Sequence, residues 1–416
     1  MRQQNLIKIL TDYKQFQIFI LGIFSGIPLF VIYTTLAAWM SQKGVDISII
    51  ASFAAARMFY SLKVFWAPFI DNIKIPYLNK LGRRKSWMYI LFFIISCIMF
   101  CYNFLDPDIS ISKIFWLTIV LGFTSATLDI VIDAYRIDNI EKEQLSIASA
   151  NAVFGYRIGG LIAGVGAFYI ASYYSWSTVF LLIAIIYFIG LVFVFTLKEE
   201  KVEAENIRQF SIDFWKKAIL EPFIDFFKKE KSILILLAII FYKLGDAFLG
   251  VIATPFYIKL GFTLLEIAVI SKLYGVVATV CGAYLGGVIM YRYGNLKGLI
   301  ICGIAQSITN LAYIWLNHCG HDNSALIITI TVENIASGMG DAALVGYLGY
   351  LCNKHFSATQ YALLSGASGL FSHTIVAFGG IIVNAIGWDI YFLMTVLLSL
   401  PGILMLVILK KIVYKI

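Results

Sequence analysis

Apolar stretches long enough to cross a bilayer dominate this chain. A membrane-spanning helix needs about 20 predominantly apolar residues, and we find twelve such stretches in the 416 residues. They are centred near residues 26, 58, 95, 124, 157, 185, 245, 278, 306, 337, 372 and 400. A closed β-barrel would show alternating segments of about ten residues, whereas the runs 90–97 and 179–189 do not alternate. The sequence therefore predicts an all-α integral membrane protein with 12 transmembrane helices.

The distribution of basic residues predicts the orientation. Lysines and arginines accumulate in the cytoplasmic loops of membrane proteins, and most of the 32 fall inside if both termini are cytoplasmic. The net charge of +8 then reflects membrane orientation, and it gives no reason to expect a nucleic-acid partner. Since 60% of the residues are hydrophobic and only 13% are charged, the composition also lies outside the range of soluble domains.

The longest polar stretch divides the chain near its middle. It runs from 198 to 231 and leaves six apolar stretches on each side. Within it, residues 210–230 mix large apolar side chains with lysines, a pattern typical of a helix on the cytoplasmic membrane surface. We therefore expect an N-terminal six-helix half over 1–197, a cytoplasmic linker with an amphipathic helix over 198–231, and a C-terminal six-helix half over 232–416.

Charged residues interrupt the apolar stretches in both halves. Each costs about 2.5 to 3.5 kcal/mol at bilayer depth even on a lenient insertion scale, so such groups normally face a water-filled path. The residues are Arg57, Lys63, Asp129, Arg157, Lys243, Asp246, Lys272, Glu333 and Asp341. The pattern favours a transporter. Because the chain has no GxxxxGK[ST] phosphate loop, ATP hydrolysis is not implied.

Two carboxylates four residues apart share one face of the fourth stretch. Asp129 lies in its inner half and Asp133 lies close to the cytoplasmic interface. A carboxylate in a low-dielectric site can hold or release a proton near neutrality, and we therefore predict that both residues take part in proton coupling. The alternative for Asp129 is a static ion pair with Arg157 or Arg57. The alternative for Asp133 is an ion-pair cluster with Arg136 at the end of the helix.

The second half supplies further candidates. Asp246 and Glu333 are predicted to take part in proton coupling, although Asp246 also lies three residues from Lys243 and can form a neutral pair with it. Basic residues in the apolar stretches suit an anionic or zwitterionic solute. Aromatic rings can stack on the faces of sugars. For each aromatic residue, the alternative is packing in the core. The predicted substrate-binding residues are Arg57, Arg157, Lys243, Lys272, Tyr156, Tyr242 and Trp39.

Glycines and prolines in three stretches predict close helix packing or an interrupted helix. The fifth stretch carries Gly155 and Gly159, whose spacing is typical of contact between transmembrane helices. Pro28 in the first stretch and Pro255 in the seventh occupy corresponding positions of the two halves, as in transporters whose interrupted helices bracket the substrate.

Several segments together resemble one transporter family. They fall in the same order as in that family, and they span nearly the whole chain. The segments are Gly26–Leu29, Ala38–Met40, Lys63–Pro68, Asp129–Ala134, Gly155–Arg157, Phe241–Phe248, Val332–Asn334, Gly338–Gly340 and Leu351–Ser365. The chain closely resembles the AmpG-type muropeptide permeases of the major facilitator superfamily.

This resemblance implies a fold of six plus six helices in the bacterial inner membrane. It also implies import of N-acetylglucosaminyl-1,6-anhydro-N-acetylmuramyl peptides from periplasm to cytoplasm by proton symport, for peptidoglycan recycling. The expected partners are this solute, protons and the lipid bilayer, and we expect a monomer without a cofactor or metal. Asp129, Lys243, Asp246 and Glu333 match the family and become its leading candidates for coupling and binding.

A loop after the second stretch resembles the signature loop of the same superfamily. It begins at Asp71 and ends in Gly82, Arg83 and Arg84, with a longer spacing than the usual pattern. The resemblance implies a gate in which the acidic group and the arginines hold neighbouring helix ends in one state of the transport cycle. The alternative is a basic inner loop that serves orientation alone.

Departures from the family pattern keep other functions open. Leu128 stands where a glutamine is expected, and Ser372 and His373 stand where an arginine is expected. The alternatives are a divergent paralogue that carries another anionic solute such as an acetyl-CoA-like thioester, a membrane sensor that moves no solute, and a membrane enzyme. For an enzyme, the segment His318–Asp322 is the one candidate metal cluster.

Overall fold

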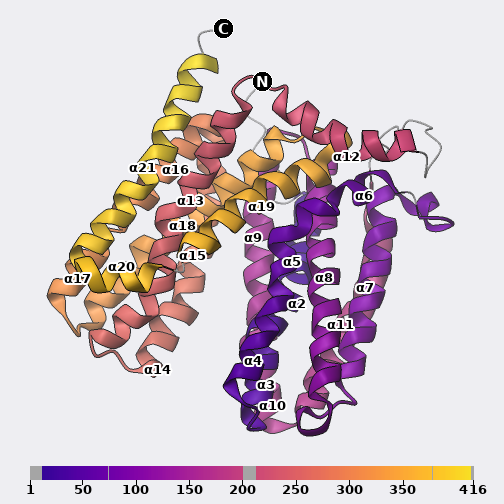
Figure 1. Cartoon of the computed structure of the whole chain (residues 1–416), viewed down its shortest axis with the longest axis horizontal. Coiled ribbons are helices and arrows are strands. Elements are labelled where there is room, and N and C mark those ends of the chain that lie inside the picture. Colours follow the sequence, from indigo (N-terminus) through magenta and orange to yellow (C-terminus); the bar gives the residue numbers. More distant parts are fainter. Residues whose placement is uncertain (1–11, 74, 200–211, 377, 414–416) are drawn as a thin grey trace. The chain divides into compact units, whose positions relative to one another are not determined.

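All regular structure in the described chain is helical, as predicted. The computed structural model describes residues 12–73, 75–199, 212–376 and 378–413 (Figure 1). The helices up to residue 196 are α2 (Tyr13–Phe30), η1 (Val31–Thr35), α3 (Leu36–Gln42), α4 (Ile47–Ser52), η2 (Phe53–Arg57), α5 (Met58–Leu62), η3 (Lys63–Phe65), α6 (Ala67–Asn72), η4 (Leu78–Leu81), α7 (Arg83–Tyr102), α8 (Pro107–Asn139), α9 (Leu145–Leu161), η5 (Ile162–Gly166), α10 (Ala167–Tyr173) and α11 (Trp176–Thr196).

The remaining helices follow residue 211. They are α12 (Ile212–Phe227), α13 (Ser232–Lys259), α14 (Leu264–Glu266), η6 (Ile267–Tyr274), α15 (Gly275–Tyr293), α16 (Asn295–Thr309), α17 (Ala312–Cys319), α18 (Asn323–Leu351), η7 (Lys354–Phe356), α19 (Ser357–Val376), α20 (Gly379–Ile386) and α21 (Trp388–Val413). The helix predicted within 210–230 is therefore present as α12. Residues 210 and 211 lie outside the described residues.

Nine helical stretches in the described ranges are long and apolar enough to cross a membrane. They are Tyr13–Gln42, Arg83–Tyr102, Pro107–Asn139, Leu145–Tyr173, Trp176–Thr196, Ser232–Lys259, Ile267–Tyr293, Asn295–Cys319 and Trp388–Ile412. The three other predicted spans, near 58, 337 and 372, are also helical. The first of them is broken into five short pieces between 47 and 72, and the second is the long helix α18, which carries two acidic residues. The number twelve stays a prediction.

The chain forms two compact units that are not continuous in sequence. The first unit comprises residues 1–141, 154–223 and 352–363. The second comprises 142–153, 224–351 and 364–416. Three helices, α9, α12 and α19, therefore begin in one unit and end in the other.

Close helix contacts build the first unit. Helix α7 packs against α8 and α11, which lie beside it in Figure 1. Gly155 and Gly159 of α9 approach the backbone of α2 so closely that a Cβ at either position would meet a backbone atom of Phe19 or Ile23. The predicted role of these glycines in helix packing is confirmed.

The second unit packs around long helices and aromatic side chains. Helix α13 runs along α21, and α15 along α18 (Figure 1). Phe256, Tyr313 and Phe392 are buried together, with ring centroids 4.8 Å apart for Phe256 and Phe392 and 5.2 Å apart for Tyr313 and Phe392. This apolar core holds the helices that carry the polar residues of the unit.

The first two predicted spans are irregular where they carry polar side chains. Pro28 cannot donate a backbone hydrogen bond, and the helix that contains it continues as the π-helix η1. The second span changes from α-helix to the 3₁₀-helix η2 and back to α-helix around Arg57. Such irregular turns within helices often mark functional sites.

Candidate functional site

Asp129 of α8 forms a buried ion pair in the first unit. Its Oδ2 lies 2.5 Å from Lys63 Nζ, and its Oδ1 accepts a hydrogen bond from the Ser25 hydroxyl at 2.9 Å. The side chains of Lys63 and Asp129 are 7% and 22% exposed. The partner that the structure shows next to the carboxylate is Lys63, on η3, which the sequence did not propose.

Asp133 lies one helical turn further and has a different partner. Its Oδ1 is 2.8 Å from an Arg136 guanidinium nitrogen on the same helix. The guanidinium also stacks over the ring of Tyr361, with its carbon 5.3 Å from the centroid. Asp133 therefore belongs to an ion-pair cluster with Arg136, the alternative that the sequence left open.

The second unit holds one lysine between two carboxylates. Lys243 Nζ lies 2.5 Å from Asp246 Oδ2 on the same helix, α13, and 2.7 Å from Asp341 Oδ1 on α18. The Ser337 hydroxyl donates weakly to Asp246 at 3.4 Å. The three charged side chains are between 16% and 28% exposed. Lys243 is thus an internal counter-ion that joins two helices.

Glu333 lies on α18 and forms a hydrogen bond with the side chain of its neighbour. Its Oε2 accepts a hydrogen bond from the Asn334 side-chain amide at 2.9 Å. The Asn334 carbonyl oxygen in turn accepts from the Thr279 hydroxyl at 2.8 Å. A half-buried carboxylate is thereby linked through an amide to α15.

Asp71, at the end of α6, caps the N-terminus of α19. Its Oδ2 accepts from the Thr359 N–H at 2.8 Å and from the Thr359 hydroxyl at 2.7 Å, and its Oδ1 accepts from the Ala358 N–H at 3.2 Å. The first N–H groups of a helix have no partner within the helix, and a negative charge there is also favoured by the helix dipole. The first residues of α19 are held by this carboxylate.

Arg84 connects Asp71 to the end of α8. Its guanidinium is fully buried and lies 2.6 Å from Asp71 Oδ1 and 2.9 Å from Asp138 Oδ2. The Ser357 hydroxyl accepts from Arg84 at 2.9 Å and donates to Asp138 at 2.7 Å. Arg83 donates to the Asp71 carbonyl oxygen at 3.0 Å. We call Asp71, Arg83, Arg84, Asp138, Ser357 and Thr359 the inner network.

Gly82 allows the chain to enter α7 next to this network. Its φ of +123° is a conformation that other residues rarely adopt, and a Cβ there would collide with the Glu199 side chain. The Glu199 carboxylate accepts hydrogen bonds from the N–H groups of Arg84 at 2.8 Å and Lys85 at 3.0 Å. The start of α7 is therefore capped by the residue that follows α11.

The other predicted basic residues have separate environments. Arg57 is half-buried and stacks on Tyr33, with the guanidinium carbon 4.3 Å from the ring centroid. Arg157 is half-buried in α9, and Lys272 is exposed in the π-helix η6. Tyr156 is half-buried against Phe30, at 5.5 Å between centroids.

Two of the aromatic residues predicted to contact the substrate are buried in this structure. Trp39 is 4% exposed and packs against Phe180 and Tyr102. Tyr242 is 3% exposed, and its hydroxyl donates to the Leu299 carbonyl oxygen at 3.3 Å. Both are core residues, which was the alternative for each ring, because neighbouring side chains cover them.

Sequence reasoning missed several partners of the charged residues. Lys63 was recognised as a charge in an apolar stretch but was not assigned to a site. Ser357 and Thr359 were not assigned either. Their polar character inside the predicted helices was the available signal, but their partners lie far away in the sequence.

The outer segment His318–Asp322 does not assemble a metal site in the described chain. His318 Nε2 lies 3.3 Å from Asp389 and His321 Nε2 lies 3.2 Å from Glu266, so the two imidazoles face different carboxylates. No group of three or more His, Cys, Asp or Glu side chains in the described ranges suits a metal ion. Hydrogen bonds from the Thr263 N–H and hydroxyl lower the pKa of Glu266 to about 2.

Comparison with known proteins gives a consistent family. The family model described as Major Facilitator Superfamily matches residues 18–332 and 235–414. A Rickettsia conorii protein named "Putative transporter AmpG 4" is 52% identical over 97% of this chain and 98% of its own. The anhydromuropeptide permease of Escherichia coli K12 is 33% identical over 94% of this chain and 79% of its own.

A solved structure has a similar fold. The crystal structure of the human organic anion transporter MFSD10 (TETRAN) matches with a TM-score of 0.66, covers 97% of this chain and 100% of that chain, and is 14% identical. At this identity the likeness concerns the fold alone. The relatives of this chain are transporters and permeases, so it is a transporter and not an enzyme.

Proposed function

Because this chain belongs to the major facilitator superfamily and to its AmpG-type branch, we propose that it imports anhydromuropeptides by proton symport. The solute is an N-acetylglucosaminyl-1,6-anhydro-N-acetylmuramyl peptide, and it moves from periplasm to cytoplasm for peptidoglycan recycling. The observation that carries this proposal is the match to the Escherichia coli anhydromuropeptide permease over 94% of the chain.

The Lys63–Asp129 pair supports coupling to protons. A proton on Asp129 would remove the charge that contacts the buried ammonium of Lys63, and losing one partner of a buried ion pair is strongly unfavourable. Protonation therefore favours a rearrangement around α8 and η3. Moving one proton through the membrane potential supplies about 2.3 kcal/mol per 100 mV. We assign the carrier role to Asp129, with Asp133, Asp246 and Glu333 as further acidic groups on the proton path.

Substrate contacts are assigned to basic residues of the predicted spans. Arg57, Arg157 and Lys272 are proposed to bind the anionic groups of the solute, and Tyr156 is proposed to contact its sugar. The inner network is proposed to act as a gate, since it holds the start of α19 through ion pairs that can break and reform. Leu128 is fully buried, so the departure at this position lies in the core.

The remaining organisation follows the family. We propose twelve membrane spans, cytoplasmic termini, halves over 1–197 and 232–416 with a linker between them, and a monomer in the bacterial inner membrane. Cysteine accessibility to a membrane-impermeant reagent, measured at single introduced cysteines in each loop, tests the span number and orientation.

The function is tested by uptake into proteoliposomes. Purified protein is reconstituted, and accumulation of labelled anhydromuropeptide is measured with and without an imposed inward proton gradient. We expect accumulation only with the gradient, and none for Asp129→Asn in the same gradient. An excess of unlabelled acetyl-CoA serves as a competitor and is expected to have no effect.

The outcomes separate the parts of the proposal. Gradient-independent equilibration of the muropeptide would contradict symport but keep the solute. Inhibition by acetyl-CoA without muropeptide uptake would identify a thioester carrier instead. Saturable binding without any uptake would indicate a sensor.

A further inference from the structure

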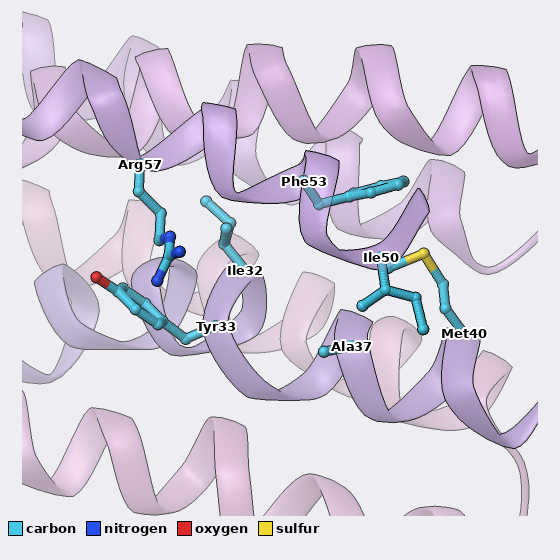
Figure 2. Close-up of a pocket in the computed structure, with 7 residues that line it drawn as sticks. All are labelled: Ile32, Tyr33, Ala37, Met40, Ile50, Phe53 and Arg57. Carbon is cyan, nitrogen blue, oxygen red and sulfur yellow. The ribbon is translucent and has the colours of Figure 1, made fainter. Parts of the chain in front are cut away.

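A pocket in the first unit combines one cation with apolar walls. It has a volume of about 190 Å³ and is lined by Ile32, Tyr33, Ala37, Met40, Ile50, Phe53 and Arg57 (Figure 2). The guanidinium of Arg57 points toward the ring of Tyr33 at one end, while Met40, Ile50 and Phe53 lie at the other. The pocket is therefore amphiphilic along its length.

Two irregular helix segments face each other across this pocket. Ile32 and Tyr33 come from the π-helix η1, and Phe53 and Arg57 come from the 3₁₀-helix η2. A π- or 3₁₀-helical turn changes the directions of the side chains relative to an α-helix, and such turns often occur at functional sites. The sequence thus departs from regular helix on both sides of the same cavity.

Arg57 differs in its partners from three other basic residues of the predicted spans. Lys63, Arg136 and Lys243 each pair with a carboxylate. Within the described ranges Arg57 has no carboxylate at ion-pair distance, and its recorded partner is the face of Tyr33. A half-buried guanidinium without an acidic partner is suited to an anion supplied by a ligand, because its planar fork binds carboxylates through two hydrogen bonds.

We propose that this pocket receives a carboxylate that bears a methyl group on its α-carbon, with the carboxylate on Arg57 and the methyl group among the apolar side chains. This inference rests on the proposed function, since anhydromuropeptides contain that group in two forms. It is present in the lactyl arm of the anhydromuramic acid when no peptide is attached, and at the end of a stem peptide that terminates in alanine.

The size of the pocket agrees with this ligand group. A cavity needs about 10 to 15 Å³ of this volume to hold one water molecule, so about 190 Å³ accommodates a small ligand group. An alanyl terminus and a lactyl arm each contain about six non-hydrogen atoms, counted with the atom that links them to the rest of the solute. An anion without an apolar arm would leave the inner end beside Phe53 and Met40 empty.

The first test uses small probes that do not depend on the identity of the cargo. Binding of N-acetyl-D-alanine, D-lactate, N-acetylglycine and N-acetyl-D-alaninamide to the full chain in nanodiscs is measured by saturation-transfer NMR. We expect both methyl-bearing acids to bind, N-acetylglycine to bind more weakly, and the neutral amide not to bind. Arg57→Gln is expected to lower the affinity for both methyl-bearing acids about tenfold, because a charge-assisted hydrogen bond is lost.

Further variants guard against misfolding and non-specific attraction. Ala37→Leu adds bulk to the apolar part of the pocket and keeps Arg57. It should weaken the binding of N-acetyl-D-alanine and leave the binding of N-acetylglycine nearly unchanged. Arg57→Lys keeps the charge and should give an intermediate affinity. The matched control is Lys113→Gln, which removes an exposed charge of α8 and should change nothing. Equal acid binding by wild type and Arg57→Gln, or absence of acid binding by the wild type, would overturn the proposal.

The second test distinguishes the two sources of the group. Binding of the peptide-free disaccharide acid and of the disaccharide with an alanine-terminated peptide is compared in wild type and Arg57→Gln. Weakening of the first alone identifies the lactyl arm, and weakening of the second alone identifies the alanyl terminus. If both bind equally in the two proteins, the pocket assignment fails and the proposed cargo stands. If neither binds while N-acetyl-D-alanine binds through Arg57, the proposed cargo fails and the pocket assignment stands.

Discussion

The two units bury their membrane charges in different ratios. In the first, Lys63 and Asp129 form a one-to-one pair with a hydroxyl on the carboxylate. In the second, Lys243 is shared by Asp246 and Asp341. Protonation of Asp129 removes the carboxylate that contacts Lys63, whereas protonation of one carboxylate in the second unit leaves the other in contact with Lys243. Protonation is therefore expected to change the structure of the first unit more than that of the second.

The largest expected effect comes from removing the shared lysine. Lys243→Met removes the cation that two partly buried carboxylates share, and we expect the free energy of unfolding to fall by about 3 to 5 kcal/mol. Lys63→Met should cost less, because it leaves a single carboxylate that is 22% exposed and still accepts from Ser25. Thermal unfolding in detergent compares the two variants. A greater loss for Lys63→Met would reverse the comparison.

A rescue experiment identifies the cause of that loss. Adding Asp246→Asn and Asp341→Asn to Lys243→Met removes both uncompensated charges, and we expect most of the lost stability to return. If the triple variant is as unstable as Lys243→Met, the lysine stabilises the second unit through packing of its aliphatic chain and not through its charge.

The next effect is on transport and concerns Asp129. Asp129→Asn mimics the protonated carboxylate permanently, so we expect gradient-driven accumulation to fall to background while exchange of labelled for unlabelled solute persists. Both are measured in the same proteoliposomes. Normal accumulation by this variant would remove Asp129 as the proton carrier, and the second unit would then become the site of coupling.

Glu333 provides a weaker test within the second unit. Glu333→Gln keeps an acceptor for the Asn334 amide but removes the negative charge. We expect solute affinity or accumulation to decrease about threefold, the effect of weakening one hydrogen bond. Binding by calorimetry and uptake are compared with the wild type, and unchanged values in both would exclude a role for this carboxylate.

A smaller effect on stability and accumulation is expected from removing the charge of Asp341, the second carboxylate that contacts Lys243. Asp341→Asn leaves Lys243 and Asp246 as a one-to-one pair like that of the first unit. We therefore expect stability near that of the wild type and accumulation well above that of Asp129→Asn. A complete loss of accumulation would show that the negative charge of Asp341 is itself required.

The smallest effect is expected for an exposed pair. Lys43 lies 3.0 Å from Asp106, and both side chains are more than a third exposed. The hydrogen bond between them raises the pKa of Lys43 and lowers the pKa of Asp106. Its contribution is present between the two unfolded pKa values, and it is lost as pH falls through the folded pKa of Asp106 or rises through that of Lys43. Lys43→Gln should leave the unfolding temperature at pH 7 unchanged within error, since water screens such pairs. A clear decrease would contradict this.

Charged residues within apolar stretches could be identified from the sequence as members of polar clusters. Asp129, Asp246 and Arg84 all lie in polar clusters, as their positions in apolar stretches or in the basic loop suggested. Their partners were harder to predict, because pairing depends on how each helix is rotated and on segments far apart in sequence. Lys63 and Asp129 are 66 residues apart, and Asp71 and Thr359 are 288 apart.

The regular helices were also easier to predict than the broken ones. Long apolar runs gave the positions of α11 and α13, because hydropathy depends on local composition alone. The division of the second span into η2, η3 and the short helices around them depends on how its side chains pack, and its sequence reads as a single stretch. For the same reason Trp39 and Tyr242 were assigned to a substrate path, although neighbouring helices cover them.

The inner network has a consequence for how the protein is made. Asp71, Arg84 and Asp138 emerge early in synthesis, but Ser357 and Thr359, which complete their hydrogen bonds, are translated long afterwards. Domains of many proteins fold in order as they leave the ribosome. Here the first unit needs residues 352–363, so it reaches its final hydrogen bonding only after most of the second unit has been translated.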